Sequence, residues 1–223
     1  MLAAFKKGIQ TTMDIILFGE RTDTHPGVIA ARELAQREDQ DPPHVYQVTK
    51  LALELFDTTR YLHKLGPSDR RLLEAAALLH DLGINRDMAT HHKHSRDMIL
   101  EAELPGFSQR EQRIIACVAR YHRKAHPKPS HRIYTELRHK DKVLVCQLAG
   151  ILRIADGLDR THAATAQRLA VTHKDNRVTI TVTQTTENET DLWGGNRKRG
   201  LFEQLFEVKV TILSHNGKRA PAA

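Results

Sequence analysis

The chain has 223 residues, of which 40% are hydrophobic and 27% are charged, and this balance is typical of a globular protein with a packed core. No apolar run is long enough to span a membrane, and the apolar stretch at 13–18 lacks the length and the cleavage site of a signal peptide. The formal net charge of +7 favours anionic partners such as phosphates or nucleotides, although charge alone is equally compatible with a role in solubility.

Helical signals dominate the first two thirds of the chain. Asp41 followed by Pro42 is typical of a helix N-terminus, and apolar residues then recur at steps of three, four and seven, which predicts an amphipathic helix. Ser108 and Glu111 have the spacing of a capping box that opens a later helix. The helices expected in chain order cover 28–38, 42–63, a segment that starts after 66–68 and ends at Gly83, about 93–102, and 108–123.

The next segment differs in character from the helices before it. Residues 137–158 are apolar on nearly every face, which predicts a buried, central helix. Beyond about residue 166 the pattern becomes rich in β-branched residues, which predicts strands. Three strands are expected at about 168–172, 177–183 and 206–213, with a helix around 192–205 that Gly194 and Gly195 weaken.

These elements predict a mainly α protein, a helical bundle followed by a small α+β subdomain of about three strands and one helix. The predicted organisation is an N-terminal arm or helix at 1–40, a helical metal-binding domain at 41–163, the α+β subdomain at 164–215 and a flexible tail at 216–223.

Histidine is over-represented and cysteine is rare. The chain contains 14 histidines although aromatic residues make up only 5% of it, and histidine is the commonest metal ligand in proteins. The cysteines, Cys117 and Cys146, both lie in apolar helical patterns, so they are expected to be reduced core residues rather than a disulfide pair. A reducing, cytoplasmic location fits this usage.

Ligand-type residues recur about once per expected helix, mostly near a helix end. His80 and Asp81 end an apolar helix, and a His-Asp pair in a core needs partners that a metal ion can supply. Facing helices of a bundle can bring such residues to one site. The candidate metal ligands are His44, His80, Asp81, His94, His122 and Asp156.

Each candidate also has an ordinary explanation when it is taken alone. His44 could cap a helix or lie at the surface, and His94 could belong to a solvated turn with His91 and His92. His122 would be favourable at a helix C-terminus. Asp156 could form a salt bridge with Arg153 or Arg160. The joint pattern favours a metal site because these explanations would all have to apply at once.

The order of these residues resembles that of HD-domain metal-dependent phosphohydrolases. More closely, about residues 40–213 resemble the C-terminal part of the exopolyphosphatase/guanosine pentaphosphatase family. The segments that carry this likeness are Glu74-Ala-Ala-Ala-Leu-Leu-His-Asp-Leu-Gly, His92-Lys-His-Ser, Leu104-Pro-Gly-Phe-Ser, Tyr121-His-Arg-Lys and Arg153-Ile-Ala-Asp-Gly-Leu-Asp-Arg. The resemblance implies that full-length relatives carry phosphatase chemistry in N-terminal actin-like domains, and nothing in this sequence resembles those domains.

The predicted function is therefore hydrolysis of a phosphate ester or anhydride, such as a nucleotide or polyphosphate, by a metal-activated water. Asp81 would bridge two ions or hold one, and His80 and Asp81 are the expected catalytic pair. His44, His80 and Asp156 would complete the shell of one ion, while His94 and His122 would bind the second. Mixed nitrogen and oxygen ligands suit Mn, Fe, Co, Ni or Zn, with Mg also open. The cations expected to bind phosphate are Lys93, Arg123, Lys124 and Arg160.

Two other functions compete with this prediction. A non-catalytic module could hold polyphosphate or a guanosine nucleotide without turnover, as a regulatory relative of exopolyphosphatase C-terminal domains. A nucleic-acid-binding role fits the basic charge, but aromatic residues are few and no base-reading motif is present. The sequence leaves a homodimer open and gives no reason to expect a membrane partner.

Overall fold

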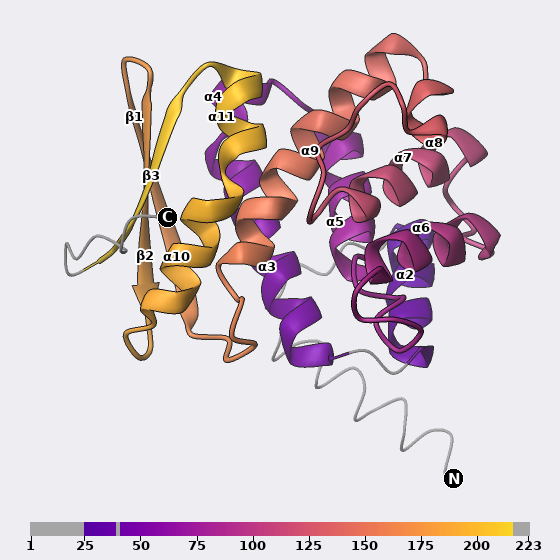
Figure 1. Cartoon of the computed structure of the whole chain (residues 1–223), viewed down its shortest axis with the longest axis horizontal. Helices are drawn as coiled ribbons and strands as arrows, with labels where there is room; N and C mark the ends of the chain where they lie inside the picture. Colours follow the sequence, from indigo (N-terminus) through magenta and orange to yellow (C-terminus); the bar gives the residue numbers. More distant parts are fainter. Residues whose placement is uncertain (1–24, 39–40, 216–223) are drawn as a thin grey trace, which may run out of the picture.

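The computed structural model describes residues 25–38 and 41–215 and is mainly α-helical (Figure 1). The predicted N-terminal arm falls mostly at 1–24, and the predicted tail lies at 216–223; these segments are outside the described residues. The helical part consists of α2 (Pro26–Arg37), α3 (Pro42–Thr58), α4 (Arg60–His63), α5 (Pro67–Leu78), α6 (His91–Glu101), α7 (Gln109–Arg120), α8 (Arg132–Thr135) and α9 (His139–Gly157). The mainly α prediction is confirmed.

Helix α9 lies at the centre of the molecule. It packs against α3, α5 and α7 on one side and against α10 (Glu189–Lys198) and α11 (Gly200–Phe206) on the other (Figure 1). From residue 144 to residue 158, every residue except Cys146 and Gln147 is buried. A helix that is apolar on every face can be stable only inside the core, and the structure confirms that this segment is the buried central helix.

The predicted N-terminal signals are present as hydrogen bonds. The Asp41 carboxylate accepts a hydrogen bond from the backbone N–H of His44, and Ser108 and Glu111 form the reciprocal capping box of α7. The expected helix at 42–63 is divided, because Thr59 separates α3 from α4. The Thr59 hydroxyl donates to the carbonyl of Leu55, a bond that competes with the helical ladder.

Helix α5 ends at Leu78, earlier than predicted, and residues 79–86 form a series of turns. Side-chain and turn hydrogen bonds replace the helical ones here: the backbone N–H of Gly83 bonds to the Ser95 hydroxyl, and that of Ile84 bonds to the Asp81 carbonyl. His80 and Asp81 therefore lie just after the helix, in backbone that can turn toward the neighbouring helices.

The C-terminal part is a three-stranded sheet covered by two helices. The strands are β1 (Ala166–Lys174), β2 (Arg177–Gln184) and β3 (Lys209–Ser214), in the order β1-β2-β3. β1 and β2 are antiparallel, whereas β2 and β3 are parallel and are connected through α10 and α11. These two helices lie between the sheet and α9 (Figure 1). The small α+β part is thus confirmed, while the domain limits at 163 and 164 stay a prediction.

Two details of this part differ from the prediction. The single helix expected at 192–205 is two helices, and the third strand begins at Lys209 because α11 continues to Phe206. Gly194 and Gly195 lie inside α10 without interrupting it. A Cβ atom added at Gly157 would lie 2.5 Å from the Gly194 carbonyl oxygen, so the glycines allow α9 and α10 to approach closely. Among the described residues, none of the helices combines the length and apolarity that crossing a bilayer requires.

Candidate metal centre

Two groups of side chains meet at Asp81, and each uses a different oxygen of its carboxylate. Asp81 Oδ2 lies 3.8 Å from Nε2 of His44, at the start of α3, and 3.6 Å from Nε2 of His80. Asp81 Oδ1 lies 3.1 Å from Nε2 of His91, the first residue of α6, and 3.4 Å from Nε2 of His122, just after α7. All five residues are buried. Each group has the composition and proximity needed to hold a metal ion.

The imidazoles are oriented by hydrogen bonds on the ring nitrogen that faces away from Asp81. Nδ1 of His80 lies 2.7 Å from the Ala77 carbonyl oxygen, and Nδ1 of His122 lies 2.7 Å from that of Ala119. Nδ1 of His91 lies 3.0 Å from the Met88 carbonyl oxygen. Because a carbonyl oxygen only accepts, Nδ1 must carry the proton in His80 and His122. At His91 the Met88 carbonyl favours the same tautomer, while Nη1 of Arg123, which only donates, also lies 3.1 Å from Nδ1. A neutral imidazole then presents a lone pair at Nε2, as a metal ligand does.

Several of these atoms lack a hydrogen-bond partner in the part of the chain that the structure describes. They are Nε2 of His44, Nε2 of His80 and Oδ1 of Asp81. Nε2 of His91 and Nε2 of His122 face each other at 3.2 Å, and the bond at Nδ1 of His122 makes its Nε2 an acceptor. Burying unpaired acceptors is costly. A divalent cation would satisfy all of these atoms, so the residues fit a metal ion.

The protonation states favoured by the structure are also those of a ligand set. Burial lowers the pKa of His80 and lowers the pKa of His122 well below its usual range. Burial acts to raise the pKa of Asp81, but the pull of the His80 and His91 imidazoles, which acts when these rings carry a proton on Nε2, outweighs it and holds that pKa well below its usual value. Neutral imidazoles and an ionised carboxylate at neutral pH are what metal coordination requires.

His44 is held differently from the other three imidazoles. Its Nδ1 lies 2.8 Å from Oδ2 of Asp159, which is fully buried. Burial acts to lower the pKa of His44, but the Asp159 hydrogen bond and the charge of Asp156 outweigh it and raise that pKa. The ring of His162 also stacks on His44, with centroids 3.8 Å apart. The sequence prediction missed both residues, although Asp159 was visible three positions after Asp156.

Asp156 lies at the edge of the cluster rather than within either group. Its Oδ1 is 3.7 Å from Nε2 of His44, while its Oδ2 accepts an ion-paired hydrogen bond from Nζ of Lys198 in α10. Burial would raise the pKa of Asp156, but the charge of Lys198 outweighs it and lowers that pKa. The sequence prediction did not include Lys198.

His94 needs a correction, because the structure brings it into neither group. His91 lies beside Asp81, at the position where His94 was expected. The predicted helix began at about residue 93, whereas α6 begins at His91, so the first residue of the helix faces Asp81. His94 is half-buried and packs against Gly83, where an added Cβ atom would lie 2.5 Å from that of His94.

A cleft of about 700 Å³ opens onto these groups, and its rim is strongly basic. Of the four cations predicted to bind phosphate, Arg123, Lys124 and Arg160 line this cleft, whereas Lys93 is exposed outside it. The prediction missed the further cationic lining residues, which are Arg153, Arg197 and Lys198.

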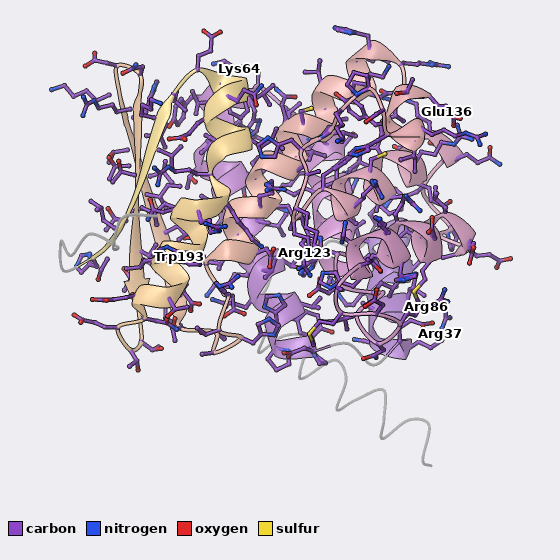
Figure 2. All side chains as sticks on the ribbon, viewed as in Figure 1. Arg37, Lys64, Arg86, Arg123, Glu136 and Trp193 are labelled. Carbon is purple, nitrogen blue, oxygen red and sulfur yellow. The ribbon has the colours of Figure 1, made fainter. Side chains whose placement is uncertain are left out.

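The two walls of the cleft come from separate parts of the chain. Trp193 and Arg123, both labelled in Figure 2, belong to α10 and to the turn after α7 respectively. The guanidinium groups of Arg160 and Arg197 each lie 5.3 Å from the centroid of the Trp193 ring, which is within the range of a cation–π interaction. Arg123 hydrogen-bonds to the Met88 carbonyl at 3.2 Å, so these arginines are held in place at the cleft.

The comparison with known protein families decides the membership of this chain. A family model described as Ppx/GppA phosphatase, domain III, matches residues 29–196. The chain belongs to the Ppx/GppA domain III family. This membership confirms the resemblance to the C-terminal part of the exopolyphosphatase/guanosine pentaphosphatase family. The residues matched by the family model include both groups around Asp81 and end before Lys198.

A curated relative of this domain III chain is a guanosine-5'-triphosphate,3'-diphosphate pyrophosphatase of Pseudoalteromonas translucida (strain TAC 125). The two sequences are 37% identical over 84 residues, which is 38% of this chain and 16% of the relative. The domain III chain therefore corresponds to only a small part of that longer protein.

Proposed function

We propose that this chain is an HD-type metal-dependent phosphohydrolase that acts on a phosphate ester or anhydride. The observation that carries the proposal is the position of Asp81, whose two carboxylate oxygens each face a different pair of inward-pointing imidazoles. A carboxylate in this position can bind one ion or bridge two. Membership of a phosphatase family supports the reaction class.

The side chains of the cluster would hold one or two divalent ions, and nitrogen with carboxylate oxygen suits Mn, Fe, Co, Ni or Zn, with Mg also open. A divalent ion held there would lower the pKa of a bound water and polarise a phosphoryl oxygen. Asp81 and His80 would fix its position. The hydrogen bonds at Nδ1 of the imidazoles would keep their lone pairs directed at it before any substrate arrives.

The basic rim would bind the phosphate groups of the substrate. Arg123 and Lys124 lie on one side of the cleft, and Arg160 and Arg197 lie against Trp193 on the other. Arginine can bind a phosphate through two parallel hydrogen bonds. A cleft with cations on both walls suits a substrate with more than one phosphate, and a nucleotide or polyphosphate has this charge.

A second candidate is a binding module that holds such a polyanion without turnover. The observation in its favour is that the chain matches only 16% of its curated relative. The basic rim would bind anions even without hydrolysis, so binding alone does not distinguish the two functions.

The test is phosphate release by the metal-loaded chain from a monoester, a nucleoside triphosphate and polyphosphate. We expect release with at least one divalent metal and its loss in Asp81→Asn. The matched control is Asp175→Asn, because Asp175 is exposed in the β1–β2 turn and has a φ of 54°, which asparagine tolerates. No release with any of the six metals would reject the hydrolase in favour of the binding module.

A further inference from the structure

Helices α9 and α10 meet at three glycines, Gly157, Gly194 and Gly195. A Cβ atom at Gly157 would lie 2.5 Å from the Gly194 carbonyl oxygen, and one at Gly195 would lie 2.8 Å from the Leu158 side chain. Residues four apart share one face of a helix, so Lys198 lies on the same face of α10 as Gly194. Asp156 directly precedes Gly157 at the end of α9. The close contact between the helices therefore brings Lys198 to Asp156.

The ammonium group of Lys198 forms a partly buried ion pair at the edge of the histidine cluster. Nζ of Lys198 donates to Oδ2 of Asp156, and the two side chains are 20% and 11% exposed. The other oxygen of this carboxylate lies 3.7 Å from Nε2 of His44. Asp156, a predicted ligand of the first ion, is thus paired with Lys198, which lies 42 residues further along the chain.

Charge balance limits what else this cluster can hold. Asp81, Asp156 and Asp159 each bring a carboxylate to the four imidazoles, and Lys198 brings one positive charge. With neutral imidazoles, one divalent ion brings the net charge of these side chains and the ion to zero. Two divalent ions would leave a net charge of two positive units. The rim is already basic, and like charges in a poorly hydrated site repel strongly.

We propose that Lys198 is a tethered cation at Asp156 and that its positive charge takes the place of the charge of a second metal ion. The centre then takes a single divalent ion, which binds at Asp81. This inference rests on the proposed metal site and specifies how many ions it holds. Lys198 would limit the number of ions that the centre binds. Lys198 lies outside the residues matched by the family model.

The test is titration of the chelator-treated full chain with Mn²⁺, followed by calorimetry and electron paramagnetic resonance. We expect one ion in the wild type with the spectrum of an isolated ion. Lys198→Met should bind two ions, or bind the second about tenfold more tightly than the wild type does, the size of effect typical of residues around a metal site. Lys198→Arg should keep one ion. Lys174→Met is the matched control, because it removes one positive charge at an exposed position of β1, and it should also keep one ion.

The outcomes separate this inference from the proposed function. Two ions in the wild type, or the spectrum of a coupled pair, would overturn the role of Lys198, and this result needs no variant to fold. One ion in both the wild type and a folded Lys198→Met would overturn it as well, while leaving the proposed function intact. No ion in the wild type would refute the metal site itself.

Discussion

Asp159 Oδ2 lies 2.8 Å from His44 Nδ1, and this buried contact directs the other nitrogen of the ring toward Asp81. The three remaining imidazoles are oriented by backbone carbonyls. Among the four imidazoles, His44 is the one whose Nδ1 is held by a carboxylate rather than by a backbone carbonyl, so its orientation can be changed by a single substitution.

Asp159→Asn should weaken metal binding about 10- to 100-fold, because a carboxylate hydrogen-bonded to a ligating histidine orients its ring and fixes its tautomer. Titration of the purified variant with Mn²⁺ measures this. The carboxylate of Asp57, which is paired with Arg70 at the surface, provides the control variant Asp57→Asn. An Asp159→Asn protein that binds Mn²⁺ as tightly as the wild type would exclude this role.

His91 and His94 provide a direct test of the metal centre. The structure places Nε2 of His91 at 3.1 Å from Asp81 and brings His94 into neither group. His91→Ala should therefore lose most of the bound metal, whereas His94→Ala should keep it. Elemental analysis of the two variants after identical purification decides the point. The opposite result would restore His94 as the ligand.

Arg123→Ala should raise the KM for a phosphorylated substrate while metal content stays at the wild-type value. The reason is that Arg123 lines the basic cleft without belonging to either ligand group. Arg86 is an exposed arginine outside the cleft, so Arg86→Ala should leave both quantities unchanged. Metal loss in Arg123→Ala as large as that in His91→Ala would contradict the division of roles between the rim and the cluster.

Arg110 should make stability depend on pH through Asp141. The hydrogen bonds from Arg110 hold the pKa of Asp141 below its usual value of 3.8, so the pair stabilises the fold above about pH 4 and loses this contribution as the pH falls through the lowered pKa. Asp141→Asn should cost about 1 kcal/mol at pH 7, since Arg110 is partly exposed. Urea unfolding at pH 7 and pH 3 tests this, and the difference from the wild type should shrink at pH 3. A difference that is constant with pH would refute the argument.

Gly194→Ala should separate α10 from α9, because the added methyl group would meet the Gly157 carbonyl. Overpacking of this kind typically costs about 1–3 kcal/mol. In Gly200→Ala, the nearest atom to the added Cβ is 4.0 Å away, so this helical substitution should stabilise by up to about 1 kcal/mol. Thermal unfolding compares the two. A Gly194→Ala protein as stable as the wild type would show that the helices do not need this close contact.

The sequence predicted the parts of the fold that depend on local patterns. The N-terminus of α3 at Asp41 and that of α7 at Ser108 follow from capping chemistry, and α9 follows from its apolar faces. The sequence could not distinguish His91 from His94, because a change of two residues in a helix start turns a different side chain toward the site. The contact of Lys198 with Asp156 depends on packing between segments 42 residues apart, which no local pattern encodes.

The close approach of α9 and α10 has a consequence for how this domain can diverge. The imidazoles belong to the helical part, whereas Trp193, Arg197 and Lys198 reach the same cleft from α10. Substitutions at Trp193 or Arg197 can therefore change the cationic wall of the cleft without replacing any histidine. One wall of the cleft is thus encoded in a stretch of the gene separate from those that encode the imidazoles, and the two can evolve at different rates.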